Sequence, residues 1–164
     1  AFQQIHPTAV TQLNIPFYQA AVEGKWQPMM DYILKAYHDT TAVRQLIEGE
    51  RNLQGFMNAY LTLTNYYLVA PEMEFSHGYC DFFLLPNYTV YPMVAHSYIL
   101  ELKYLKTEAS DAEAARQWTE AVAQIKTYAA DKKLKSMLHD TELHCIVVQI
   151  KGYDVVKMEE IAER

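Results

Sequence analysis

The chain has 164 residues, of which 51% are hydrophobic and 21% are charged, so it can form one domain with a substantial core. It contains no run of about 18 apolar residues and no basic leader before a short apolar block, which argues against a membrane span and a secretory signal. The formal net charge of −6 is unusual for a protein that acts on nucleic acid, because phosphate binding usually leaves a basic surface. Because neither a membrane span nor a secretory signal is predicted, we expect a soluble protein with no membrane partner.

The cysteines and histidines follow none of the common zinc patterns. Cys80 and Cys145 lie in separate apolar runs without a C-x-x-C spacing, which favours buried free thiols in a reducing, cytoplasmic setting. The histidines show neither H-x-H nor H-E-x-x-H spacing; they are His6, His38, His77, His96, His139 and His144. Zinc-dependent hydrolysis is therefore not predicted.

Residues 1–47 are predicted to form a helical lead-in, or a linker from an upstream domain. The segment Ile15–Trp26 is expected to be helical, and Pro28 sits in the first turn of a second helix, a position where proline is well tolerated. That helix carries an apolar stripe formed by Met30, Ile33, Leu34 and Tyr37. Residues 48–164 are predicted to be the main domain.

A third helix is predicted to begin at Glu50. Its apolar residues recur at intervals of three and four, at Leu53, Phe56, Met57, Tyr60 and Leu61. Glu50 precedes Leu53 by three residues and Met57 by seven, which places its carboxylate on or beside the buried stripe. The alternative is a first-turn glutamate that is favoured only by the helix dipole.

Three strands, a helix and two further strands follow. The strands are predicted at Tyr66–Met73, Tyr79–Leu85, Tyr98–Tyr104, Leu143–Ile150 and Tyr153–Met158, and Pro71 marks the end of the first strand or an edge position. Ser110 and Glu113 form a capping box that opens the intervening helix, and Gln124 lies at the border of its packed face. This order predicts an α/β fold with a mixed sheet.

The most informative residues are an aspartate in the second strand and a Glu-Leu-Lys triplet in the third. Side chains alternate along a strand, so Glu101 and Lys103 project from the same side. With Asp81 from the neighbouring strand, two carboxylates could hold a divalent cation and the ammonium could orient a water that attacks a phosphodiester. An acidic and a basic residue two apart are also common as a simple ion pair.

These motifs resemble the PD-(D/E)xK nuclease superfamily. A closer resemblance is to the nuclease-like domain that follows an AAA-type ATPase domain in a group of bacterial proteins. The matching stretches are Glu50–Phe56, Gly78–Asp81, Tyr98–Tyr104, Gln124–Tyr128 and the strand that ends in Lys151-Gly152-Tyr153. Cys80 stands where the superfamily has its namesake proline.

The resemblance implies a restriction-endonuclease-like mixed sheet flanked by helices, and a nuclease that cleaves DNA, with RNA as the alternative. It implies that Asp81, Glu101 and Glu50 bind Mg²⁺ or Mn²⁺ and that Lys103 activates the attacking water. Gln124 would position Lys103 or the phosphate. The implied partners are nucleic acid and an AAA-type ATPase domain in the same full-length chain.

Two other functions remain open. The same fold could serve as a non-catalytic nucleic-acid-binding or assembly module for the ATPase, since members of this superfamily have lost activity. A small-molecule hydrolase that uses the same carboxylates is the third alternative. Glu48 is the substitute for Glu50, and Glu74 could also approach the metal.

Overall fold

The computed structural model describes residues 7–40, 49–75 and 78–162, and within them the side chains of residues 7, 9, 71–75 and 78–81 are not described. Four helical elements of the described residues precede the first strand: α1 (Pro7–Tyr18), a π-helical turn η1 (Gln19–Glu23), α2 (Gln27–Asp39) and α3 (Glu50–Leu61). Two more, α4 (Asp111–Ala129) and α5 (Lys132–Met137), connect the third and fourth strands. The strands are β1 (Tyr67–Phe75), β2 (Gly78–Pro86), β3 (His96–Leu105), β4 (Glu142–Lys151) and β5 (Asp154–Glu160).

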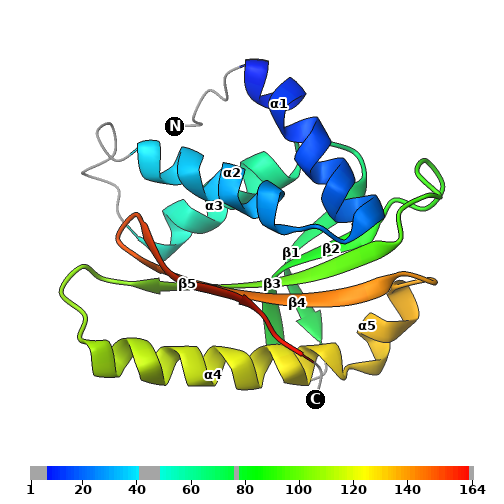
Figure 1. The fold of residues 1–164 in the computed structure, drawn as a ribbon. Coiled ribbons are helices and arrows are strands. Elements are labelled where there is room, and N and C mark those ends of the chain that lie inside the picture. The colour runs from blue at the N-terminus through cyan, green and yellow to red at the C-terminus, as the bar shows by residue number, and fades with distance from the viewer. Residues whose placement is uncertain (1–6, 41–48, 76–77, 163–164) are drawn as a thin grey trace.

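The strands form one five-stranded sheet in the order β1-β2-β3-β4-β5. Neighbouring strands are antiparallel except β3 and β4, which are parallel because α4 and α5 carry the chain back between them. The chain thus has the predicted mixed sheet flanked by helices, consistent with a restriction-endonuclease-like α/β fold (Figure 1).

Helices cover both faces of the sheet. The helices α1, α2 and α3 lie on one face, and α4 lies on the other (Figure 1). Alternation along β3 follows this division, because Tyr98 and Leu100 belong to the core beneath the N-terminal helices whereas Ile99 belongs to the core beneath α4. A side chain on β3 can therefore be assigned to a face from its position in the strand.

The N-terminal helices belong to the main core. Leu13 of α1, Phe17 of α1 and Ile33 of α2 are fully buried in the same cluster as the sheet residues Leu100 and Ile146. The segment is helical, as predicted, and it covers a face of the sheet. The division of the chain at residues 47 and 48 stays a prediction.

Three local features either differ from the predictions or add detail to them. The strand β1 continues past Pro71, which is tolerated because β1 is an edge strand and needs ladder hydrogen bonds on one side only. Ser110 caps α4 as predicted, its hydroxyl accepting a hydrogen bond from the Glu113 amide at 3.2 Å. The short helix α5 was not predicted; Asp131 caps it by accepting from the Lys133 and Leu134 amides.

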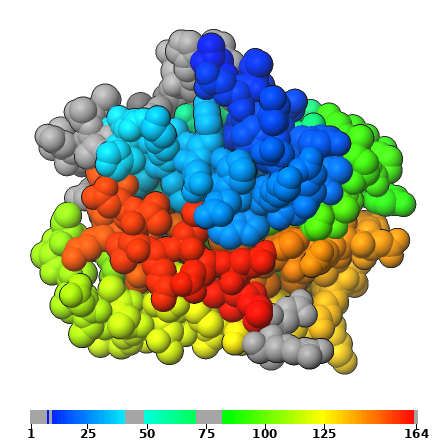
Figure 2. Space-filling view, viewed as in Figure 1, coloured from blue at the N-terminus to red at the C-terminus, as the bar shows by residue number. Residues whose placement is uncertain are grey.

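The edge strand β5 runs across the surface between the N-terminal helices and α4 (Figure 2). Most of its side chains are exposed, and Gly152, with φ of +65°, makes the tight turn from β4. Among the described residues, no helix combines the length and the apolar character that a membrane crossing requires.

Candidate active site

Glu101 and Lys103 lie on the face of the sheet that α4 covers. They share their side of β3 with Ile99, which packs in the α4 core together with Val147 of β4 and Ile125 of α4. The predicted common direction of the two side chains is thus what the structure shows.

Glu101 is buried and forms an ion pair with Lys103. Its side chain is 2% exposed, and its Oε1 lies 3.0 Å from the Lys103 Nζ, whose side chain is 24% exposed. A carboxylate in an apolar core is costly unless a charge or hydrogen bonds compensate it. The lysine supplies that charge, and its side chain is only partly buried.

Gln124 of α4 is the second partner of the lysine. The Lys103 Nζ donates a hydrogen bond to the Gln124 Oε1 at 3.2 Å, and the Gln124 amide nitrogen donates to the Tyr128 hydroxyl at 2.5 Å. Tyr128 is fully buried one turn further along α4. The glutamine is thus oriented by the helix core, and it fixes the ammonium between α4 and Glu101.

Gln149 of β4 extends this polar layer and was not predicted as a site residue. It pairs with Lys103 across the parallel ladder, is 2% exposed, and donates to the Ala114 carbonyl and to the Gln117 Oε1. Gln117 in turn donates to the Tyr104 carbonyl. The sequence offered one signal for this residue: it is a single amide in the apolar run of β4, at a position whose side chain faces α4.

The backbone of Asp81 lies in β2, next to this layer. Phe82 pairs with Leu100, so Asp81 and Glu101 are the next positions beyond that pair on the two antiparallel strands. The side chains of Asp81 and Glu74 lie outside the described ones, as does all of Glu48. Their approach to a metal ion stays a prediction.

Glu50 does not lie on the buried stripe of α3. It is the first residue of the helix and is exposed, whereas Leu53, Phe56 and Met57 are buried. This exposure fits the alternative of a first-turn glutamate that is favoured by the helix dipole. A role for Glu50 at the metal remains a prediction, now for a solvent-exposed carboxylate at a helix start.

The family model of the PD-(D/E)XK nuclease superfamily matches residues 48–160, which is more than half of the chain. The chain belongs to the PD-(D/E)XK nuclease superfamily. Members of this superfamily generally use divalent metal ions. No curated protein and no solved structure matches the chain.

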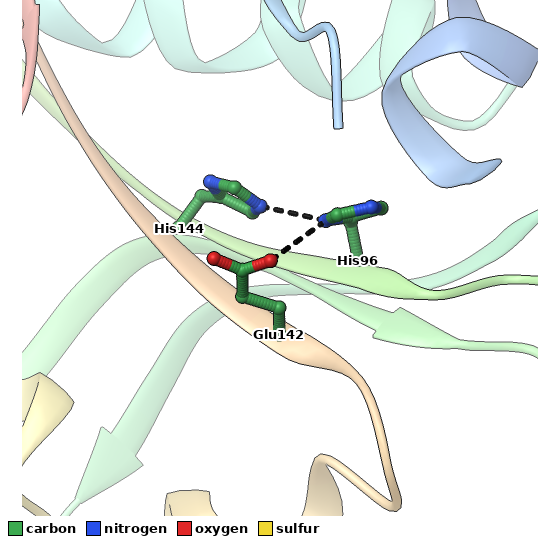
Figure 3. Close-up of side chains that lie close together, drawn as sticks. All are labelled: His96, Glu142 and His144. Carbon is green, nitrogen blue, oxygen red and sulfur yellow. Dashed lines mark hydrogen bonds and ion pairs between the residues drawn. The ribbon is translucent and has the colours of Figure 1, made fainter. Parts of the chain in front are cut away.

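This PD-(D/E)XK domain also contains a polar cluster that the sequence did not predict. His96 at the start of β3 meets Glu142 and His144 at the start of β4, on the side of the sheet that carries the N-terminal helices (Figure 3). Burial, and next the neighbouring His144, lower the pKa of His96. No motif spacing signals this cluster, because its two histidines are 48 residues apart and meet only through the parallel pairing.

Proposed function

We propose that this domain is a metal-dependent nuclease that hydrolyses phosphodiester bonds of DNA, with RNA as the alternative substrate. The observation that carries the proposal is the buried Glu101 carboxylate 3.0 Å from a lysine that α4 holds in place through Gln124. An ion pair that serves only stability gains little from burial. This pair also lies within residues 48–160, which match the superfamily model, and its Glu-Leu-Lys order resembles the E-x-K motif of that superfamily.

The oxygen donors available here suit a hard divalent cation. Glu101 offers a carboxylate on the sheet, Asp81 is the next position on the adjacent strand, and Glu50 would be the third ligand. Mg²⁺, or Mn²⁺ in its place, prefers carboxylate and water oxygens. When bound, the cation would supply positive charge for the phosphodiester and lower the pKa of water.

The chain's own groups perform the remaining tasks. Lys103 has an ammonium that donates hydrogen bonds and a partly exposed side chain, and it would orient a water molecule or stabilise charge on the phosphate. Gln124 acts as a positioning residue, because it accepts from Lys103 while Tyr128 fixes its amide. Glu101 pairs with Lys103 and so helps to hold the ammonium in place.

The resemblance to the domain that follows an AAA-type ATPase in bacterial proteins supports a second part of the proposal. The full-length chain would carry such an ATPase domain, and the nuclease domain would act on nucleic acid delivered by it. To test this association, the full-length protein is expressed with an intact and with a disabled ATP site, and the cleavage rates of the two versions are compared.

The direct test uses the 164-residue chain with linear, circular and single-stranded DNA and with RNA, each in Mg²⁺, Mn²⁺ or EDTA. We expect cleavage with a divalent ion and none in EDTA. Lys103→Ala should reduce cleavage by at least about 100-fold, as expected for loss of a positioned catalytic group.

Lys25→Ala is the matched control, because it also removes one positive charge but from an exposed lysine that pairs with surface Glu23 at 3.1 Å. It should cleave like the unmodified protein. If the unmodified protein cleaves none of these substrates with either ion, yet binds them, the domain is a non-catalytic binding module. If Lys25→Ala and Lys103→Ala lose activity equally, only the overall charge matters and the assigned site is wrong.

A further inference from the structure

The cluster of His96, Glu142 and His144 has the composition and spacing of a metal site. One ligand atom from each residue lies within 4.8 Å of the others. The His96 Nδ1 is 2.8 Å from the His144 Nε2 and 3.7 Å from the Glu142 Oε2. Ligand nitrogens of a tetrahedral zinc lie about 3.3 Å apart, since each Zn–N bond is about 2.0–2.1 Å. A separation of the two rings by about half an ångström would accommodate the ion.

A carboxylate also contacts the second ring nitrogen of one of the two histidines. The His144 Nδ1 contacts the Glu160 Oε1 of β5, and the carboxylate can only accept, so Nδ1 carries the proton. In this tautomer the lone pair is on Nε2, which faces His96. A carboxylate that orients a histidine through its second nitrogen is the usual support of a metal-binding imidazole.

The surrounding backbone holds the cluster in place. The Ala95 amide donates to the Ala21 carbonyl, and the Tyr98 hydroxyl donates to the Ala20 carbonyl, so η1 is fixed against the start of β3. Gly24, with φ of +73°, lies against the His96 ring so closely that an added Cβ would be 2.7 Å from its Cε1. The Tyr98 ring stacks on His144 with centroids 5.0 Å apart.

We propose that His96 Nδ1, His144 Nε2 and Glu142 bind one Zn²⁺ ion, with Glu160 supporting His144 and a fourth position open to water. Binding requires that the His96 proton move from Nδ1 to Nε2, which leaves the lone pair on Nδ1 for the metal. The ion would join the starts of β3 and β4 and, through Glu160, the end of β5.

The donor set selects the metal. Imidazole nitrogens favour zinc and the neighbouring late transition ions, whereas Mg²⁺ prefers oxygen ligands. Cys145 follows His144 directly but packs in the core beneath α4, on the other face of the sheet. The site therefore has nitrogen and oxygen ligands without a thiolate.

This site is separate from the proposed nuclease site. His96 precedes Glu101 by five residues along β3, a distance of roughly 16 Å in an extended strand. The histidines share the face of Leu100 and Ile146, whereas Glu101 shares the face of Ile99. The inference thus stands whether or not the domain cleaves nucleic acid.

The test is titration of the chain with ZnCl₂ in the presence of excess Mg²⁺, followed by a chromogenic zinc chelator and by the melting temperature. We expect one tightly bound equivalent and a rise in melting temperature. His144→Gln should lose at least tenfold in affinity. The Glu142 side chain is 71% exposed, so Glu142→Gln should leave folding unchanged, and its zinc affinity should also fall about tenfold.

Two control variants locate the site. His38→Ala removes an exposed histidine that also lies beside carboxylates, those of Asp39 and Asp154, and should leave zinc affinity unchanged. Glu101→Gln should leave it unchanged as well. Co²⁺ in place of zinc should give visible d–d bands without a sulfur charge-transfer band in the near ultraviolet.

Three results would overturn the proposal. The first is the absence of one-equivalent binding, and the second is unchanged affinity in both His144→Gln and Glu142→Gln. The third is loss of binding in Glu101→Gln, which would place the zinc in the nuclease site instead.

Discussion

The two faces of the central sheet carry polar groups that are assembled in different ways. On the α4 face, Glu101 and Lys103 are two residues apart in one strand and contact each other directly. On the opposite face, His96 and His144 come from two strands and meet only because β3 and β4 are parallel and in a fixed register. The first arrangement can be read from strand alternation, whereas the second requires the fold.

The largest effect on stability is expected from breaking the ion pair of the α4 face. Lys103→Ala leaves the Glu101 carboxylate in a buried position without its cation, which should lower the free energy of unfolding by roughly 3 kcal/mol in EDTA. Urea denaturation followed by circular dichroism measures the change.

The double variant Glu101→Gln/Lys103→Met is the control for this prediction. It replaces both charges by neutral side chains of similar size and should be close to the unmodified protein in stability. Equal loss of stability in the single and double variants would show that packing, not the stranded charge, is responsible.

A change at Gly24, which lies against the His96 ring, should have the next largest effect on stability. Gly24→Ala introduces a Cβ at a positive φ and against the His96 ring, so it should cost roughly 1–2 kcal/mol of unfolding free energy. It should also reduce the rise in melting temperature that Zn²⁺ produces.

Gly55→Ala is the matched control. Gly55 lies inside α3, where an added Cβ meets nothing within 4 Å, so alanine should stabilise the helix slightly, by about 0.5–1 kcal/mol. A full zinc response in Gly24→Ala would mean that Gly24 does not position His96.

A smaller effect is expected from the glutamine that orients Lys103. Gln124→Ala removes the acceptor of Lys103 and the donor to Tyr128, at a cost of about 1 kcal/mol in stability. In steady-state cleavage kinetics kcat should fall about tenfold with KM nearly unchanged, because the residue positions a catalytic group and does not bind substrate.

Thr119→Ala, on the exposed side of the same helix, is its control and should leave kcat unchanged. A change in KM alone for Gln124→Ala would instead assign the glutamine to substrate binding.

The smallest effect on folding is expected at Glu50. This exposed residue contributes little to stability, so Glu50→Gln should change the free energy of unfolding in EDTA by less than about 0.5 kcal/mol. If Glu50 is a metal ligand, Mn²⁺ should raise the melting temperature of Glu50→Gln less than it raises that of the exposed control Glu23→Gln. An identical rise in both variants removes Glu50 from the metal site.

Much of the fold could be predicted because local rules govern it. The apolar stripes of α2 and α3, the Ser110 cap and the alternation along β3 each depend on residues close in sequence. The same alternation placed Glu101 and Lys103 on one side, and helical spacing placed Gln124 at the border of α4.

The features that were missed depend on distant contacts. Gln149 joins the α4 layer only through its register with Lys103, and His96 meets His144 only across the parallel pair. Helical spacing placed Glu50 on or beside the buried stripe, yet its side chain is exposed, because spacing gives a direction but does not say where the core ends. Strand pairing and the limits of a packed surface are tertiary properties that one sequence does not display.

The proposed metal-dependent nuclease site on the α4 face of the sheet is tested most directly by single-turnover cleavage of one defined DNA duplex, with Mn²⁺ and then with EDTA. The unmodified chain is compared with Glu101→Gln. We expect cleavage only by the unmodified chain and only with Mn²⁺. Equal cleavage by Glu101→Gln, or cleavage that persists in EDTA, would contradict the assignment.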